Sequence, residues 1–428
     1  MTTRLTYAVI LVITLNACSR SQAPLTVHDI PLSPDEIAII QTLSPPPPPS
    51  KKPTNQFADS PEAASLGQYL FFEAGLSHNG EISCATCHKP ELDWTDGRPV
   101  AKGLRMTTRN TPSLLNLANN RWFYWDGRKD SLWSQSLSPI ENDKEMGGSR
   151  LRVFRTISAS AEMKRFYSAV FGPLPTIDVP KEINDAKPLE NPPENRHHQN
   201  WQTLSDDQRK SLNRVFANAG KAIAAFERKL ISQDSSFDRF VAAINANERE
   251  KLADYSAPAL RGLKLFIGKA QCTLCHSGPN FSDMEFHNIG LNRGQGDLDL
   301  GRHLGIPAVL SDPFNGKGDF SDDTSITANT PLHYVGQKSN NIGEFKTPGL
   351  RNVAKTAPYM HDGRFENLRS VVDFYSTLPQ QPAVGHREES LVQLNLNDQQ
   401  KSDLVAFLES LTGQPLPARL LKKPGVQR

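Results

Sequence analysis

The chain has 428 residues, of which 48 are basic and 46 acidic, and 37% are hydrophobic. This length allows two or three ordinary domains. The formal charge of only +2 argues against nucleic acid or an acidic surface as a partner.

The N-terminus has the pattern of an export signal. Arg4 precedes an apolar run that is too short to span a bilayer, and Leu15-Asn16-Ala17-Cys18 follows it. Residues 1–17 therefore predict a signal peptide. Leu-x-Ala-Cys resembles a bacterial lipobox, in which Cys18 becomes the lipidated first residue; an ordinary signal peptide is the alternative. Both readings predict export to the periplasm, and Ser19 after the cysteine favours anchoring at the outer membrane.

A proline-rich stretch follows the signal. Residues 44–53 contain five consecutive prolines, a composition that is typical of a stiff polyproline II spacer. We expect residues 18–56 to form a tether that holds a globular body away from the membrane.

Two cysteine motifs dominate the rest of the chain. Cys84-Ala85-Thr86-Cys87-His88 has the spacing of a c-type haem attachment site, and Cys272-Thr273-Leu274-Cys275-His276 repeats it. The two thiols of such a motif bind the porphyrin and its histidine binds the iron. A zinc site of four thiolates is the alternative, but it leaves both histidines unexplained. The motifs predict two covalent haem c groups, with His88 and His276 as iron ligands.

Apolar residues at helical spacing lie before both motifs. Residues 64–72 and 260–266 are predicted helices, and both contain Gly-x-x-Leu-Phe, which indicates a duplicated module. Further helices are predicted from Leu212 to Leu230, over 368–378 and over 398–411.

Residues 288–345 are rich in Gly, Asp and Asn and are predicted to form ordered loops. The expected fold is therefore mostly α with long ordered loops, in two c-type cytochrome domains. We place these domains at residues 57–235 and 236–413, with a basic, solvated tail over 414–428.

The ligand opposite each histidine decides whether a haem reacts or only carries electrons, because a reactive haem keeps one axial position open. No histidine occurs between His88 and His197. A peroxide-splitting site needs a carboxylate to move a proton and polar neighbours to hold the oxygen. Gln135, Pro139 and Glu145 are candidates, although Glu145 taken alone would more often be an exposed acid.

These features resemble the bacterial di-haem cytochrome c peroxidases over residues 55–413. Trp125-Asp126-Gly127-Arg128, followed by Gln135, Pro139 and Glu145, is similar to the bridging tryptophan and distal pocket of that family. The resemblance implies that Trp125 lies between the haems. It also implies that Gln135, Pro139 and Glu145 line the open face of the first haem, with Glu145 as the acid–base group.

A second stretch, from Thr356 to Gly363, also resembles the family. The resemblance implies that the carbonyls of Thr356 and Pro358, with the side chain of Asn110, bind Ca²⁺ between the haems. Oxygen donors suit this hard cation, but three neutral donors make a weak site, so calcium rests on the resemblance. His361, in the same stretch, fits a structural role beside a haem propionate.

Two departures from the best-known members bear on mechanism. Those members carry a histidine after the first motif that blocks the reactive iron. Here Lys102, Leu104 and Arg105 occupy that region, so the first haem is expected to be open at rest. Their second haem has a methionine as sixth ligand, and Tyr375 stands at that position.

Tyr375 shares a predicted helical face with apolar neighbours, so a buried core tyrosine is the alternative to a ligand. A phenolate ligand lowers the potential of a haem, whereas a thioether raises it. Both departures resemble the MauG-type branch, whose members oxidise tryptophan side chains of a partner protein.

We therefore predict a periplasm-facing, lipid-anchored oxidoreductase that reduces hydrogen peroxide at the first haem and draws electrons through the second. The electrons come from a small donor protein, a cytochrome c or a cupredoxin, or, in the MauG-type alternative, from a protein substrate. A non-enzymatic di-haem electron carrier is the alternative of another class. The resemblance also gives a homodimer as one candidate assembly.

Overall fold

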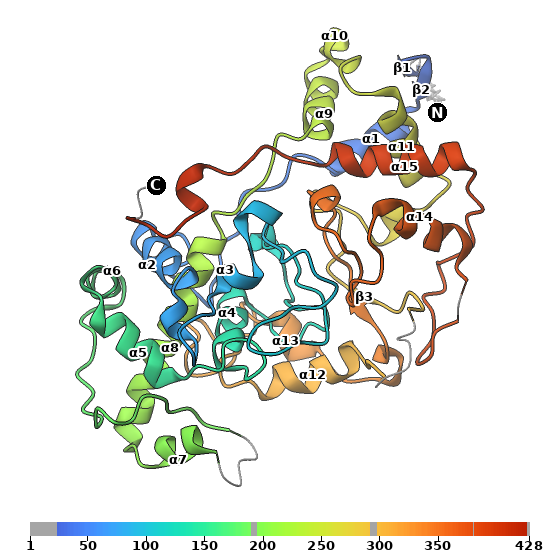
Figure 1. Cartoon of the computed structure of the whole chain (residues 1–428). Helices are drawn as coiled ribbons and strands as arrows, with labels where there is room; N and C mark the ends of the chain where they lie inside the picture. Colours follow the sequence, from blue (N-terminus) through green and yellow to red (C-terminus); the bar gives the residue numbers. More distant parts are fainter. Residues whose placement is uncertain (1–23, 190–194, 292–297, 380, 426–428) are drawn as a thin grey trace, which may run out of the picture.

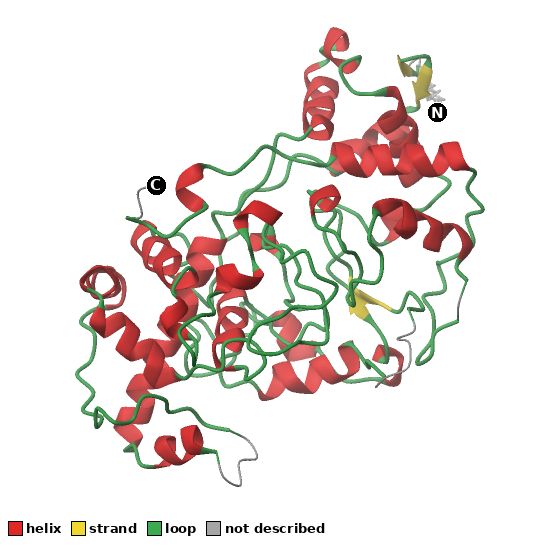
Figure 2. Cartoon of the chain, in the orientation of Figure 1, coloured by secondary structure: helices red, strands yellow, loops and turns green. Residues whose placement is uncertain are grey.

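The computed structural model describes residues 24–189, 195–291, 298–379 and 381–425. Helices and long loops make up this part of the chain, which confirms the predicted fold class (Figure 2). Its strands form two short antiparallel pairs. These are β1 (Leu25–Val27) with β2 (Ile30–Leu32), and β3 (Phe286–His287) with β4 (Phe345–Lys346). The predicted signal peptide and Cys18 lie outside the described residues.

The first lobe, residues 54–235, surrounds the first cysteine motif. Its helices are α2 (Pro61–Phe71), α3 (Cys84–Cys87), α4 (Leu132–Glu141), α5 (Arg150–Ala159), α6 (Ala161–Phe171), α7 (Arg196–Gln202) and α8 (Asp206–Glu227). Most of them begin after a serine whose hydroxyl accepts a backbone N–H of the first turn, as Ser205 does for α8.

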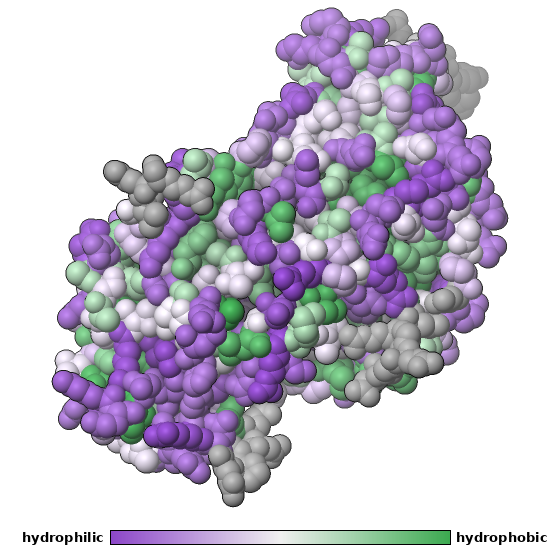
Figure 3. Space-filling view, viewed as in Figure 1, coloured by the Kyte–Doolittle hydropathy of each residue, from purple (hydrophilic) through white to green (hydrophobic). Residues whose placement is uncertain are grey.

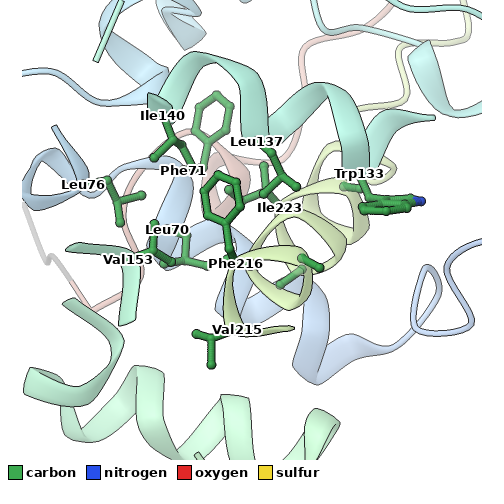
Figure 4. Close-up of a cluster of buried hydrophobic side chains, with 14 of the residues drawn as sticks. Leu70, Phe71, Leu76, Trp133, Leu137, Ile140, Val153, Val215, Phe216 and Ile223 are labelled. Carbon is green, nitrogen blue, oxygen red and sulfur yellow. The ribbon is translucent and has the colours of Figure 1, made fainter. Parts of the chain in front are cut away.

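Helix α8 is the centre of this lobe. Its predicted apolar stripe is buried, and the side chains of α2, α4 and α5 pack around it (Figure 4). At Gly67 of α2, a Cβ atom would lie 1.9 Å from the carbonyl oxygen of Ala222. Only glycine lets α2 and α8 approach this closely.

The second lobe, residues 236–413, repeats this crossing around the second cysteine motif. Its helices are α9 (Ser236–Ala246), α10 (Arg249–Leu252), α11 (Ala257–Ile267), α12 (Arg302–Ser311), α13 (Thr330–Tyr334), α14 (Leu368–Thr377) and α15 (Asp398–Ser410). Helix α11 packs on α15, where a Cβ on Gly262 would lie 1.9 Å from the carbonyl oxygen of Asp403.

The stretch from 288 to 345 differs from the loops expected, since its described part contains α12 and α13. Gly305 and Pro307 interrupt the apolar spacing of α12, so helical periodicity did not predict this helix. Phe314, just after it, packs into the core of the first lobe. This stretch therefore joins the two lobes.

The expected tether over residues 18–56 is wrong for its described part. Residues 25–43 form β1, β2 and α1 (Pro34–Thr42), and Leu32 and Ile40 are fully buried in the core of the second lobe. Ser44, at the start of the proline run, donates to Asp238 at 2.6 Å. Two short strands and a helix that pack on the second lobe, and not a free spacer, occupy residues 25–43.

The C-terminal segment is also more ordered than a solvated tail. Leu420 packs into the core of the first lobe, Gln68 of α2 donates to the carbonyls of Arg419 and Lys422, and Lys423 pairs with Glu73. Each terminal segment of the described chain therefore packs on the lobe that lies farther from it in the sequence. The N-terminal segment lies on the second lobe and the C-terminal segment on the first (Figure 1).

The surface seen in Figure 3 is largely hydrophilic, with small scattered apolar patches. None of the described helices combines the length and the apolar character needed to cross a membrane.

Candidate haem sites and active site

The two motif histidines are held in the same way. Nδ1 of His88 lies 3.0 Å from the carbonyl oxygen of Trp94, and Nδ1 of His276 lies 2.9 Å from that of Phe281. Because a carbonyl only accepts, each Nδ1 donates, and Nε2 is the ring nitrogen that remains to bind iron. Burial lowers the pKa of His88 to about 4, so its ring is neutral, the form that binds a metal.

The surroundings of the two motifs repeat along the chain. One constant offset relates Thr111-Pro112 to Thr347-Pro348, Asn116 to Asn352, and Asp126-Gly127-Arg128 to Asp362-Gly363-Arg364. The backbone repeats as well, because Asn116 and Asn352 both have φ of 60° and Tyr124 and Met360 have φ of 65° and 76°. This repeat is a signal of duplication that Gly-x-x-Leu-Phe alone gave only weakly.

A cavity of about 320 Å³ lies against the second motif. Cys272, Cys275 and His276 line one side, and the walls are mostly apolar, as a porphyrin requires. Tyr375 on α14 lines the same cavity. The residues of this site therefore fit a covalently bound haem.

Tyr375 faces this cavity without a hydrogen-bond partner for its hydroxyl among the described residues, and burial raises its pKa. Buried tyrosines normally find such a partner, and Tyr359 in the same cavity does, donating to the carbonyl of Val353. The constant offset of the repeat relates Tyr375 to Pro139. A free hydroxyl at this place is what an oxygen ligand to iron needs.

The predicted distal residues of the first lobe are brought together by α4. Pro139 has no N–H, so the carbonyl of Gln135 one turn earlier accepts no helical hydrogen bond, and the hydroxyl of Tyr124 donates to it at 3.5 Å. The amide of Met146 donates back to the carbonyl of Pro139 at 3.1 Å, which folds the loop that carries Glu145 onto α4. The side-chain oxygen of Gln135 is buried and has no partner.

Glu145 is a half-buried acid in this pocket. Burial raises its pKa, and the nearby guanidinium of Arg128 partly opposes the shift. Its charge also acts on the thiols of Cys84 and Cys87, so it lies close to the first haem site. An acid with a raised pKa next to an unpaired amide oxygen can move a proton and hold a small polar molecule.

Three side chains of this site had no role predicted from the sequence, although Arg128 belongs to the stretch Trp125-Asp126-Gly127-Arg128 that carries the family resemblance. Tyr124 stacks under the guanidinium of Arg128, which lies 3.4 Å from the ring centre. Both flank the Trp-Asp-Gly motif, which could have pointed to them. Glu227, at the end of α8, is fully buried near Cys84, and burial raises its pKa to about 8. Glu227 lies four residues after Ile223 and three before Leu230, so its place on the apolar face of α8 was the signal that could have identified it as a buried acid.

Trp125 lies where the lobes meet. Its indole N–H donates to the carbonyl of Asn110 at 3.0 Å, and its own carbonyl accepts the N–H of Lys346 in β4 at 2.8 Å. It also lines the cavity of the second motif. Trp125 is therefore bonded to both lobes.

The residues expected to bind calcium, Asn110, Thr356 and Pro358, line the same cavity. Asn110 donates its amide N–H to the carbonyl of Arg98 at 2.8 Å, so its side-chain oxygen is free to accept or to bind a cation. His361 is buried and stacks on Phe345, with ring centres 3.7 Å apart.

The loop over residues 101–107 stands where a blocking histidine would be. The amides of Leu104 and Arg105 donate to the carbonyls of Glu145 and Lys144, both at 2.9 Å. A Cβ on Gly103 would lie 2.5 Å from the carbonyl oxygen of Glu145. This loop therefore packs against the Glu145 loop, and residues 101–107 contain no histidine.

Comparisons with known proteins agree with this arrangement. Residues 61–246 match the family model described as di-haem cytochrome c peroxidase. The chain is 33% identical to the methylamine utilization protein MauG of Methylorubrum extorquens over 371 residues, 85% of this chain and 82% of that protein. It is 30% identical to the cytochrome-c peroxidase IdrP1 of a Pseudomonas species, covering 84% of each chain.

Among solved structures, a MauG-like protein associated with microbial copper homeostasis matches with a TM-score of 0.60 and 27% identity, over 88% of this chain and 97% of that one. Two motif histidines held alike, a mostly apolar cavity against the second motif and an acid with a raised pKa near the first thus coincide with relatives that align with 84 to 85% of this chain. The protein belongs to the di-haem cytochrome c peroxidase/MauG family of peroxidase-type oxidoreductases, a family that implies two haem c groups.

Proposed function

We propose that this protein reduces hydrogen peroxide to water at the haem held by His88, with electrons that arrive through the haem held by His276. The observation that carries this proposal is the half-buried acid Glu145, whose charge acts on the thiols of Cys84 and Cys87 and whose loop is bonded to Pro139 of α4. When bound, a haem with an open axial position supplies the redox chemistry that breaks the peroxide bond.

The side chains of the pocket have distinct roles in this proposal. Glu145 takes a proton from one peroxide oxygen and delivers it to the other, and the unpaired oxygen of Gln135 holds the substrate by a hydrogen bond. Two further protons and two electrons complete the formation of two water molecules. Trp125 provides the path for electrons, since it is bonded to both lobes.

Tyr375 favours a second candidate function. With an oxygen ligand, the second haem has a low potential and is suited to holding an oxidising equivalent. In this case the electrons come from tryptophan side chains of a partner protein, as in the MauG-type branch, and not from a cytochrome c or cupredoxin. We propose periplasmic location, the lipid on Cys18 and Ca²⁺ at Asn110, Thr356 and Pro358 as features common to both candidates.

A peroxide titration of the diferric protein tests these candidates. If both haems change spectrum without prior reduction, the open first haem and the MauG-type candidate gain support. If the protein reacts only after one haem is reduced, the first site is closed at rest, and electron transfer from a donor protein is indicated. Cyanide that binds to neither haem would refute both candidates and indicate an electron carrier.

A further inference from the structure

Three side chains on the outer side of the first lobe converge outside both haem sites. They are His78, in the loop before the first cysteine motif, Asp185, before α7, and His197, in the first turn of α7. Nδ1 of His78 lies 3.4 Å from Oδ2 of Asp185, and Nε2 of His197 lies 3.9 Å from the same oxygen. All three atoms lie within 4.8 Å of one another.

Hydrogen bonds do not account for this convergence. Neither imidazole makes a side-chain hydrogen bond to any described residue, and Nδ1 of His197 is buried without a partner. The two rings are tilted by 49° with centres 5.4 Å apart, so they do not stack. The two imidazoles face one carboxylate oxygen at ion-pair distances of 3.4 and 3.9 Å but make no hydrogen bond to it. Such an arrangement is typical of a metal site without its metal.

We propose that His78, Asp185 and His197 form a binding site for a divalent transition-metal ion. Imidazole nitrogen with carboxylate oxygen suits zinc or copper, and three protein ligands leave a further position for water. Ligand atoms of a tetrahedral zinc ion are about 3.3 Å apart, given bonds of about 2.0 Å. The side chain of His78 is 56% exposed, so it is free to make the small inward movement required.

Arg152 is the neighbour that bears most directly on this site. Its Nε donates to Oδ1 of Asp185 at 2.7 Å and its Nη2 to Oδ2 at 2.5 Å, while Ser149 also donates to Oδ1. Each carboxylate oxygen has two lone pairs, so Oδ2 keeps one for a metal. Arg152 therefore fixes the direction of the carboxylate but weakens binding through its positive charge.

The site is attached to the loop that carries Glu145. The backbone N–H of His78 donates to the carbonyl of Met146 at 2.9 Å. From the Asp185 side, Lys187 donates to the carbonyl of Glu141 and to Asp143 at 2.5 and 2.8 Å. A metal ion that binds both His78 and Asp185 would thus connect two segments that each bond to the Glu145 loop. This holds whatever reaction the loop serves.

Zinc binding to the untagged, haem-loaded chain tests the proposal. After removal of metals with EDTA, we expect isothermal titration with zinc sulfate, and metal analysis after gel filtration, to give about one zinc ion for every two irons. His78→Ala and His197→Ala should each weaken zinc binding at least about tenfold. Arg152→Gln should strengthen it, because the competing positive charge is gone.

His198→Ala is the matched control. His198 is adjacent on α7, but its ring accepts from the backbone of Leu189 and contacts Gln202, so its loss should leave zinc affinity unchanged. His78 is exposed, and its alanine variant decides the question even if His197→Ala does not fold. Wild-type zinc affinity in His78→Ala, or no stoichiometric zinc in the wild type, would overturn the proposal.

X-ray absorption at the zinc edge supplies an independent readout. We expect imidazole scattering and a nitrogen/oxygen shell near 2.0 Å, without a sulfur shell near 2.3 Å. A sulfur shell would place the zinc at a cysteine left without haem, such as Cys275 near Asp283 and His287, and would also overturn the proposal.

Discussion

Glu145 combines burial, which raises its pKa, with an adjacent loop that holds it near the first haem site. As a base for peroxide it must be ionised, so the rate of the peroxide reaction should rise as the pH climbs through this raised pKa. Glu145→Gln should lower the rate about 10²- to 10⁴-fold and abolish that rise. Stopped-flow absorbance of the diferric protein with peroxide measures both effects.

The control for this variant is Glu91→Gln, because Glu91 is an exposed acid in the loop after the first motif. It should keep the wild-type rate and pH profile. An unchanged profile in Glu145→Gln would instead assign the proton transfer to another acid, with Glu227 the nearest buried candidate.

Tyr375 is the residue that most directly separates the two candidate functions. Tyr375→Met should raise the potential of the second haem by on the order of 100 mV or more, since a thioether stabilises ferrous iron relative to a phenolate. Spectroelectrochemical titration measures this potential. Tyr359→Phe is the control, because Tyr359 lines the same cavity but donates to Val353; equal potentials in all three proteins would show that Tyr375 is not a ligand.

At the scale of elements, the two helix crossings depend on glycine. A side chain at Gly67 or Gly262 meets a backbone carbonyl of α8 or α15 at 1.9 Å, so the helices must separate. Gly67→Ala and Gly262→Ala should each lower the free energy of unfolding by about 3 kcal/mol or more. Urea unfolding followed by circular dichroism measures the loss.

Gly336→Ala tests whether any glycine would behave in this way. No described atom lies within 4 Å of a Cβ built there, and its φ is not in the left-handed region. The free energy of unfolding of the Gly336→Ala variant should differ from that of the wild type by less than about 0.5 kcal/mol. A similar small change at Gly262 would mean that α11 can move away from α15 without cost.

The elements that the sequence predicted well are those with a strong local signal. The stripe of α8 and the spans of α14 and α15 are set by the spacing of apolar residues within each helix. The segment 25–43 was missed because its burial depends on the second lobe, which lies far away in the sequence, and because the five prolines beside it suggested a spacer. Local helix and strand propensities carry no information about such distant partners.

The same contrast holds for the sites. Cysteine spacing identified both haem motifs, because thioether attachment needs the ligands on one turn. Tyr124 donates to the carbonyl of Gln135, which is free because Pro139 has no N–H. This contact joins two separate elements, so local spacing in the sequence could not predict it. His78 and His197 lie far apart in sequence and carry no spacing that would predict a site.

At the scale of the molecule, Asp238 ties the N-terminal segment to the second lobe. It forms two contacts of 3.0 Å with Arg351 and accepts from Ser44. Burial alone would raise the pKa of Asp238, but Arg351 and Ser44 outweigh it and lower the pKa. Its contribution to stability is therefore complete above the ordinary value near 3.8 and is lost as the pH falls through the lower folded value.

Asp238→Asn should lower the free energy of unfolding by about 3 kcal/mol or more at pH 7, because Arg351 is left buried without its counter-charge. The difference from the wild type should shrink in strongly acidic solution. Urea unfolding at several pH values measures it. Asp234→Asn, which removes an exposed partner of Arg239, should change stability by less than about 1 kcal/mol.

The packing of the N-terminal segment on the second lobe and of the C-terminal segment on the first lobe constrains the order in which the molecule can fold. Gln41 bonds to Asn245 across 204 positions and His28 to Tyr255 across 227, so the described N-terminal segment has its partners much later in the chain. Pairings this distant close slowly, because a long loop must be ordered before any contact compensates for it. Among the described residues, helix α1 therefore docks only once the second lobe has formed, and residues 418–423 complete the first lobe.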